Sequence, residues 1–446
     1  MSTQVQKLLA RAEHFTHSNY PREAIKCYLQ LIQLIGAHWE VFFRLGDAYR
    51  AVGDFESAQN YYLKSKELAP DKTFPICRLA WIAERRGLLN EAHDLVHELV
   101  FVDRAHVNAL TMWATIQRRL GKSEETIPII TEALKQDRSA EELSLLHYVL
   151  GQNSEAIQDY SQAFFHFKKA NEYRGQTYDP QQRTAQTERL LTVPSLAPLH
   201  RSPLPVTPVL IVGFMRSGST VLEQALGRHP QISICGEHQA LGAIAEQVPR
   251  QLGFHSDWPE ASAKFSAAQA LQVANLYLSE MGKVGTNPQG TFIVDKTLTN
   301  YKLIDFALRI LPNVKIINCV RDPLDTCLSC FVTNFTQDHA FSTRLDWLGH
   351  EYLLYQKLMA KYQDRAEVHT IHYESLVSSP REELQKALAF LSVEWEEACL
   401  SPEQNDRVVA TASYAQVKKP FHRGSVDRAQ KYYEELYPLR MALGLD

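Results

Sequence analysis

The sequence predicts an α-helical solenoid followed by an α/β domain with a parallel sheet. Two observations carry this prediction: self-similarity at a period of 34 residues over the first 175 residues, and an alternation of short apolar strands with helical stretches after Pro208. The chain has 446 residues, of which 45% are hydrophobic, and this is enough for two packed cores. We expect a helical repeat domain over 1–175, a proline-rich linker over 176–207 and the α/β domain over 208–446.

Small residues recur at fixed places in the repeat. They are Ala24, Ala58 and Ala92, and likewise Gly53, Gly87 and Gly121. In the clearest copy, residues 45–70, Ala58 lets two helices approach, Tyr62 fills the neighbouring gap and Pro70 ends the second helix. This pattern resembles the tetratricopeptide family, with four to five repeats and a slip of three residues in the period near 138–147.

The resemblance to tetratricopeptide arrays implies a concave surface. Such surfaces usually bind a peptide or protein partner. A second interpretation stays open, in which the array is a packing or dimerisation scaffold for the domain that follows. In that case the protein can form a homodimer.

Four apolar segments of the second domain have the length of buried strands: 209–214, 291–295, 314–320 and 368–373. Helical stretches separate them, which is typical of a parallel sheet. Ligands of such folds bind at the carboxyl ends of the strands, and polar clusters follow the first and third segments.

The first polar cluster is Gly213-Phe-Met-Arg-Ser-Gly-Ser-Thr220. Two glycines allow tight turns, and successive N–H groups with the next helix N-terminus can surround a phosphate. Compared with the nucleotide-binding pattern G-x-x-x-x-G-K-[ST], Ser219 replaces the lysine, and we expect no strand to end in a magnesium-binding aspartate. An ATPase or kinase is therefore disfavoured, although a kinase with unusual phosphate contacts stays an alternative.

The second polar cluster, residues 319–330, places Arg321 directly after a strand and predicts a helix from near Pro323. Ser329 lies two turns into this helix and can converge with Arg321 on a second phosphate. Two separate anion sites suggest a donor with phosphate groups at both ends of its ribose. Cys327 and Cys330 form a C-x-x-C pattern, which we interpret as core-facing thiols rather than a redox or zinc pair.

These loops, together with Cys-Gly-Glu at 235–237 and Val-Asp-Lys at 294–296, resemble the sulfotransferases that use 3′-phosphoadenosine 5′-phosphosulfate (PAPS). The arrangement is most similar to tyrosylprotein sulfotransferases and to bacterial tetratricopeptide–sulfotransferase proteins, and it covers roughly 209–433.

The resemblance implies a set of PAPS-binding residues. The 5′-phosphosulfate is assigned to Arg216, Ser217, Gly218, Ser219 and Thr220, the 3′-phosphate to Arg321 and Ser329, the adenine to Tyr373, and further nucleotide contacts to Gln416, Lys419 and Arg428. Two positions depart from the family pattern: Thr333 stands where the tyrosylprotein enzymes carry arginine, and Ala429 where bacterial relatives carry tryptophan.

The resemblance also implies catalytic roles. Glu237 is expected to be the general base for the acceptor hydroxyl, with the adjacent His238 as the alternative base. Lys296 stabilises the leaving phosphate, Arg216 neutralises the sulfuryl group and Ser413 assists. Cationic side chains take the role of a metal, so we expect none.

Composition limits the remaining possibilities. A net charge of −4 argues against bulk nucleic-acid binding, and no apolar run approaches the ~18 residues of a membrane helix. Seven scattered cysteines and no apolar signal core favour a cytoplasmic protein. The acceptor stays open between a peptide tyrosine, a saccharide and a small molecule, and an interaction scaffold that binds nucleotide without turnover is the alternative function.

Overall fold

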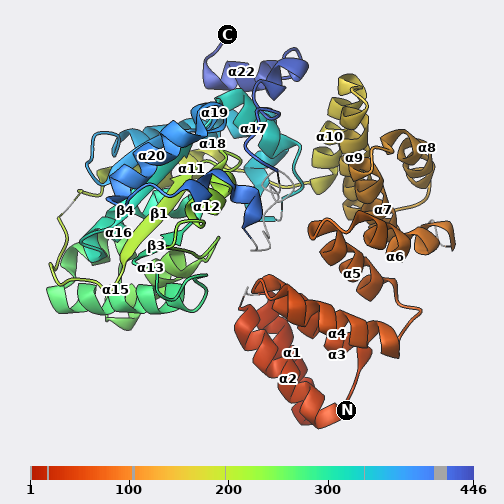
Figure 1. Cartoon of the computed structure of the whole chain (residues 1–446), viewed down its shortest axis with the longest axis horizontal. Coiled ribbons are helices and arrows are strands. Elements are labelled where there is room, and N and C mark those ends of the chain that lie inside the picture. Colours follow the sequence, from red (N-terminus) through yellow and green to blue (C-terminus); the bar gives the residue numbers. More distant parts are fainter. Residues whose placement is uncertain (1–2, 18–19, 103–105, 196, 336, 406–418) are drawn as a thin grey trace. The chain divides into compact units, whose positions relative to one another are not determined.

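The structure is a computed structural model that describes residues 3–17, 20–102, 106–195, 197–335, 337–405 and 419–446 (Figure 1). These residues fold as two compact units, whose boundary in the chain lies between Arg174 and Gly175.

The first unit is built of helices that pack in successive pairs. Its described helices are α1 (Thr3–His17), α2 (Pro21–Ile35), α3 (Trp39–Ala51), α4 (Phe55–Leu68), α5 (Thr73–Arg85), α6 (Leu89–Val102), α7 (Val107–Arg119), α8 (Ser123–Ala133), α9 (Ala140–Ala156) and α10 (Tyr160–Arg174). The first helices of three consecutive pairs, α3, α5 and α7, begin at residues 39, 73 and 107, which matches the predicted period. The predicted slip falls in the last pair, where α10 begins at residue 160.

Close packing within each pair explains the recurring small residues. Ala58 is fully buried, and a side-chain carbon added at Gly46 would lie 2.6 Å from the ring of Tyr62. The last pair repeats this contact, because a carbon at Gly151 would lie 2.6 Å from the ring of Phe167. Small residues therefore let aromatic rings of the second helix lie directly on the first.

The last helix pair also contains two facing histidines. The Nδ1 atoms of His147 on α9 and His166 on α10 lie 2.9 Å apart, so one ring donates to the other. Burial, together with the nearby His166 and Lys169, lowers the pKa of His147 to about 4, against the effect of Glu172. Both rings are thus neutral in the folded unit at pH 7.

This histidine pair predicts a pH dependence of stability. The unfolded chain, in which the pKa of a histidine is about 6.5, binds protons before the folded unit does, so stability is lost as the pH falls from about 6.5 to about 4. Because water partly screens the site, we expect a loss of about 1 kcal/mol between pH 7.5 and 5 in urea unfolding. His147→Phe should reduce this loss, whereas His255→Phe, at an exposed site of the second unit, should leave it unchanged. An equal pH dependence in the wild type and in His147→Phe would contradict the assignment.

The second unit contains a five-stranded parallel sheet in the order β2-β3-β1-β4-β5. Its strands are β1 (Thr207–Gly213), β2 (Ile232–Ile234), β3 (Phe292–Asp295), β4 (Lys315–Val320) and β5 (Val368–His372). The four predicted strands are present within one or two residues of their expected bounds. The short edge strand β2 was not predicted, since three residues carry too little pattern to distinguish a strand from a loop.

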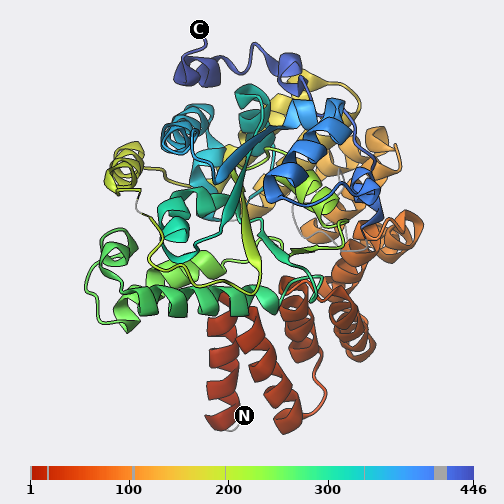
Figure 2. The same cartoon turned by 60° about the vertical axis from the view of Figure 1, so that its left-hand side comes forward.

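Helices lie on both faces of this sheet (Figures 1 and 2). The described helices of the unit are α11 (Pro180–Thr192), α12 (Ser219–Leu226), α13 (Ala240–Gln251), α14 (Trp258–Ala261), α15 (Ala267–Gly282), α16 (Ile304–Ile310), α17 (Pro323–Phe331), α18 (Leu345–Ala360), α19 (Tyr373–Ser378), α20 (Pro380–Leu391) and α22 (Tyr437–Leu443); the 3-10 helices used below are η2 (Leu298–Leu303) and η6 (Arg428–Tyr432). Ile211 and Ile317 pack with α12, α19 and α20 in one core cluster. Asn318, the residue after Ile317 in β4, faces the opposite side of the sheet. Its side chain there accepts a hydrogen bond from Tyr355 of α18 (2.8 Å).

The proline-rich segment expected as a linker is fastened to the second unit. It contains α11, whose Arg183 pairs with the buried Glu351 of α18. Tyr178 donates to the same carboxylate (3.0 Å). Burial alone would raise the pKa of Glu351, but Arg183 and the nearby Lys302 hold it below its usual value.

Among the described helices, none is long and apolar enough to span a bilayer.

Candidate functional site

Two loops meet at the carboxyl ends of the neighbouring strands β1 and β4. Gly213 at the end of β1 pairs in register with Cys319 of β4. The chain leaves β1 toward β2 on one side of the sheet and later returns to β4 on the other, so this is the position where the strand order reverses. Open α/β sheets bind ligands at such a position.

The loop between β1 and α12 has an unusual backbone. Arg216 has a positive φ of 69°, which costs a residue other than glycine about 1 kcal/mol or more. Gly218, with φ 89°, is the N-cap of α12 and has no side chain to cap the helix, and helix N-termini of this kind bind anions. The Ser217 hydroxyl is buried and has no hydrogen-bond partner in the described protein. Since buried polar groups are nearly always bonded, this hydroxyl fits the oxygen of a ligand.

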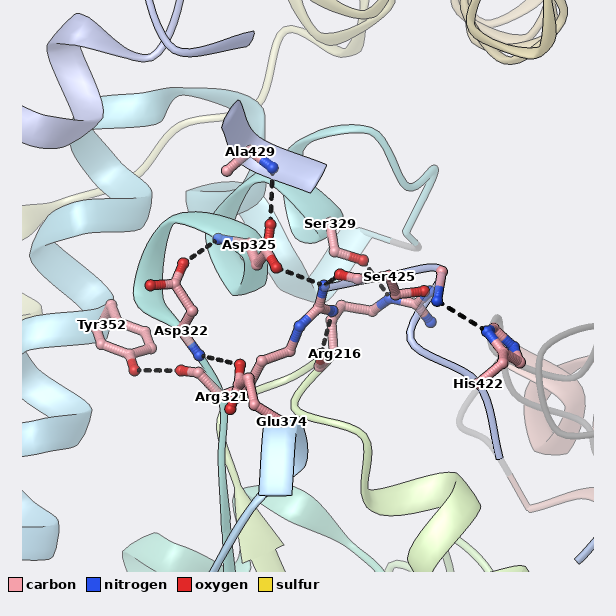
Figure 3. A network of polar contacts seen from close by, with 11 residues as sticks. Arg216, Arg321, Asp322, Asp325, Ser329, Tyr352, Glu374, His422, Ser425 and Ala429 are labelled. Atoms are coloured by element: carbon pink, nitrogen blue, oxygen red, sulfur yellow. Dashed lines mark hydrogen bonds and ion pairs between the residues drawn. The ribbon is translucent and has the colours of Figure 1, made fainter. Parts of the chain in front are cut away.

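Guanidinium groups gather around this loop (Figure 3). Arg216 Nε donates to Ser329 Oγ on α17 (3.0 Å), and Arg321 donates to the carbonyl oxygens of Arg216 (3.1 Å) and Ser425. Burial, together with the nearby charges of Arg321 and Arg428, lowers the pKa of Arg216 to about 10. Three positive charges that lie close together repel one another, and a nearby anion offsets this repulsion.

Arg321 is held in place by contacts with three side chains. Asp325, one turn into α17, lies 3.3 Å from its guanidinium, and the ring of Tyr373 lies 5.0 Å from it in a cation–π contact. Tyr352 donates to its carbonyl oxygen (3.2 Å). The Nε of Arg321 is nevertheless buried without a hydrogen-bond partner among the described residues, so a donor is available to a bound ligand.

Tyr373 also supports the loop between β1 and α12. A side-chain carbon at Gly218 would lie 2.2 Å from the Tyr373 ring, so the ring rests directly on the loop backbone. Burial raises the pKa of the Tyr373 hydroxyl, and the phenol is neutral at pH 7.

Ala429 and Thr333, the two positions that depart from the family pattern, both make hydrogen bonds to residues of α17. The N–H of Ala429 in η6 donates to Asp325 (2.7 Å), which fastens the C-terminal segment to the arginine cluster. The Thr333 hydroxyl donates to the carbonyl of Ser329 (2.7 Å) at the end of α17. Neither position therefore supplies a charged or aromatic ligand contact of its own.

Lys296 and Glu237 form an ion pair beside the loop. The Lys296 side chain is 0% exposed and its Nζ lies 2.5 Å from Glu237 Oε1, whereas the Glu237 side chain is 48% exposed. The carboxylate also raises the pKa of Arg216, which places it in the same electrostatic field. The buried ammonium of Lys296 thus holds the carboxylate of Glu237, which remains accessible from solvent. His238 is partly buried, and its carbonyl accepts a hydrogen bond from the Thr297 hydroxyl (3.1 Å).

Strand β3 ends in an aspartate, Asp295, as the predicted bounds of this strand have it. Its carboxylate accepts hydrogen bonds from Tyr277 (3.1 Å), Asn300 (3.0 Å) and the Thr297 N–H (2.9 Å). Burial raises the pKa of Asp295 to about 6 although these bonds oppose the shift. Asp295 therefore serves the core, and its oxygens face donors of the protein.

A cavity beside the loop is lined by five of the predicted residues. It is lined by Arg216, Gly218, Thr220, Val221, Arg321, Tyr373, Val377, Pro420, Phe421 and His422. Ser217, Ser219 and Ser329 lie buried around it, and Arg428 is near Arg216. Lys419 is exposed and is not among the lining residues, while Ser413 and Gln416 lie outside the described residues.

Sequence reasoning missed two aromatic lining residues, Phe421 and His422, and the anchoring carboxylate of Asp325. The proximity of Phe421 and His422 to Lys419 and Pro420 was the available signal. Cys327 and Cys330 are buried free thiols, and burial raises the pKa of Cys330 to about 12, in line with the core interpretation.

Parts of both units match models of known protein families. Residues 208–397 match the model of the sulfotransferase family, and residues 39–72 match the tetratricopeptide repeat model. An uncharacterised protein of Aquifex aeolicus is 27% identical over 84% of this chain and 51% of its own length. A protein-tyrosine sulfotransferase of Drosophila melanogaster is 24% identical over 44% of this chain and 40% of its own length.

Among solved structures, the sulfotransferase domain of the Synechococcus olefin synthase is similar, with 21% identity, a TM-score of 0.38, and coverage of 53% of this chain and 90% of that domain. The chain spans about half or less of the length of the curated relatives named above. Residues 208–397 are thus similar to the sulfotransferase family, and residues 39–72 to the tetratricopeptide repeat.

Proposed function

We propose that this protein transfers a sulfuryl group from PAPS to an acceptor hydroxyl. The observation that carries the proposal is the gathering of Arg216, Arg321 and Arg428 at the carboxyl ends of β1 and β4. Two buried donors there, Ser217 Oγ and Arg321 Nε, lack a partner in the described protein. A ligand with several anionic oxygens satisfies the hydroxyl and the guanidinium together.

The cluster has two ends, which suits a donor with two separated phosphate groups. Ser217 and the N-terminus of α12 form the end that would hold the 5′-phosphosulfate. Arg321 and Ser329 on the β4–α17 side would hold the 3′-phosphate, and Tyr373 lies between them against both Gly218 and Arg321. PAPS supplies the activated sulfuryl group when bound.

The chain's own residues perform the transfer in this proposal. Glu237 accepts the proton of the acceptor hydroxyl as the bond between its oxygen and sulfur forms. The bond between sulfur and the phosphate oxygen breaks, and Lys296 stabilises the charge left on that oxygen. Because Lys296 is withdrawn from water, its charge acts more strongly than it would at the surface. Arg216 neutralises the sulfuryl oxygens.

The acceptor that we favour is a peptide tyrosine, because several relatives carry the name protein-tyrosine sulfotransferase. A saccharide and a small phenol or alcohol use the same chemistry. The tetratricopeptide region is proposed to bind a protein or peptide partner, which the acceptor itself can be.

Calorimetry with 3′-phosphoadenosine 5′-phosphate tests the donor without an acceptor. We expect tighter binding of this nucleotide than of ADP or Mg-ATP. Arg321→Ala should weaken it by about ten- to a hundredfold, because charged hydrogen bonds contribute about 1.5–3 kcal/mol. Ser329→Ala should weaken it less.

The matched control for this measurement is Arg381→Ala, at an exposed arginine of α20 that pairs with Glu397. It should bind the nucleotide like the wild type. Equal or tighter binding of Mg-ATP would contradict the proposal and favour a kinase. Tight nucleotide binding without turnover for any acceptor would favour the scaffold.

A further inference from the structure

Glu223 is a buried carboxylate that none of the roles above explains. It lies in α12, the helix that begins at the phosphate loop, and it is 2% exposed. Burial of a carboxylate is costly, and a negative charge one turn from an anion site opposes binding of an anion. An apolar residue at this inward position would pack in the core at less cost. The carboxylate therefore calls for a role that an apolar side chain cannot perform.

The bond made by Glu223 indicates that role. Its Oε1 accepts the N–H of Gly236 at 2.7 Å. Gly236 precedes Glu237, the proposed base, and has a positive φ of 73°, so the chain turns sharply just before the base. The carboxylate thus holds the peptide group between Cys235 and Gly236, one residue before the proposed base.

The same turn is tied to β3 by two backbone hydrogen bonds. Cys235 donates to the Val294 carbonyl (2.9 Å), and the N–H of Lys296 donates to the Gly236 carbonyl (3.0 Å). Gly236 is consequently held on one side by β3 and Lys296, which directly follows it, and on the other by α12. The hydrogen bond from Gly236 to Glu223 therefore links α12, which follows the loop that would hold the donor, to the turn that carries Glu237 next to Lys296.

We propose that Glu223 is a positioning residue, which fixes the distance between the proposed base Glu237 and the donor bound at the N-terminus of α12. The inference rests on the proposed sulfuryl transfer. In that reaction the acceptor oxygen must meet sulfur in line with the leaving phosphate oxygen, and a misplacement of about 1 Å costs about a hundredfold in rate. Glu223 touches neither the donor nor the acceptor and acts through the Gly236 peptide group.

Two substitutions separate the hydrogen bond from packing and charge. Glu223→Gln keeps an oxygen that can accept the Gly236 N–H and removes the charge. Glu223→Met has a similar length but no acceptor. Glu246→Gln, at an exposed site of α13, is the control for loss of one carboxylate.

The first readout, amide hydrogen exchange of the full chain, needs no donor. In Glu223→Met the exchange at Gly236 should rise by about tenfold, whereas Glu223→Gln should stay within about twofold of the wild type. Exchange in the loop Gly213–Gly218 should not change. Unchanged exchange at Gly236 in Glu223→Met would overturn the proposal.

The second readout is hydrolysis of PAPS, in which water replaces the acceptor. The water oxygen bonds to sulfur, the bond from sulfur to the phosphate oxygen breaks, and Glu237 receives the proton. Glu223→Met should lower kcat by about ten- to a hundredfold, with the affinity for 3′-phosphoadenosine 5′-phosphate within about twofold of the wild type. Glu223→Gln should restore most of the rate.

The outcomes distinguish this inference from the proposed function. A normal kcat in Glu223→Met, or a parallel loss of nucleotide affinity and kcat, would overturn the positioning role. If the wild type itself neither binds the nucleotide nor hydrolyses PAPS, the proposed function fails and the positioning role fails with it, whatever the variants do.

Discussion

Exchange of Glu237 for glutamine is expected to lower the rate of sulfuryl transfer by about 10²- to 10⁴-fold, the usual effect of losing a general base. Glutamine keeps the length of the side chain and can still accept a hydrogen bond from Lys296, but it cannot take the proton of the acceptor. Affinity for 3′-phosphoadenosine 5′-phosphate should change by less than about threefold, because the phosphate contacts are assigned to other residues. Rates of PAPS turnover in single-turnover experiments, together with calorimetry of the product nucleotide, check both parts.

The neighbouring histidine supplies the control for this prediction. His238→Gln should keep most of the activity if Glu237 is the base. A large loss in His238→Gln with a normal rate in Glu237→Gln would transfer the role to the imidazole, the alternative that the sequence left open. Comparable losses in both variants would contradict a single base at either position.

Replacement of Gly218 by alanine is expected to have the largest effect on the structure of the site. Its φ of 89° is unfavourable for any other residue, and the added carbon would meet the Tyr373 ring at 2.2 Å. Strain and overpacking together should cost about 2–5 kcal/mol, and the loop should lose its anion site as the Tyr373 ring moves. Thermal unfolding and nucleotide calorimetry measure the two effects.

Gly242 is a matched control for this substitution. It lies inside α13, and a carbon added there meets no atom within 4 Å. Gly242→Ala should therefore stabilise the chain by up to about 1 kcal/mol, since alanine favours the helix. A stable Gly218→Ala variant with wild-type nucleotide affinity would show that the loop does not depend on the close contact with Tyr373.

Local patterns in the sequence were sufficient for the helical repeat and for the long strands. The spacing of Ala58 and Tyr62 reflects contacts between helices that are adjacent in the chain, so each copy of the repeat contains its own evidence. The loop at Arg216 could likewise be predicted, because glycines, hydroxyls and a helix start fall within eight residues. The placement of the cluster around Arg321 at the same edge of the sheet could be predicted from the rule that ligands of parallel sheets bind at the carboxyl ends of the strands.

Long-range contacts explain what the sequence did not reveal. The bond from Gly236 to Glu223 joins residues of two elements, and nothing in the local pattern of α12 distinguishes Glu223 from a surface carboxylate. The same holds for Asp295, whose three donors come from α15, η2 and the turn before it. The attachment of the segment around Arg183 depends on a single buried partner, Glu351, which lies 168 residues further along the chain.

The turns of the repeat region have a consequence for how its length can change. Gly53, Gly87 and Gly121 adopt nearly the same left-handed conformation, with φ of 81°, 83° and 78°, and a carbon added at each would meet open space. Deletion or duplication of one 34-residue copy would therefore join a turn to an equivalent turn and a helix face to an equivalent face. The array can lengthen or shorten by whole copies, and an altered number of copies would vary the exposed surface of the first unit while the sequence of the second unit stays the same.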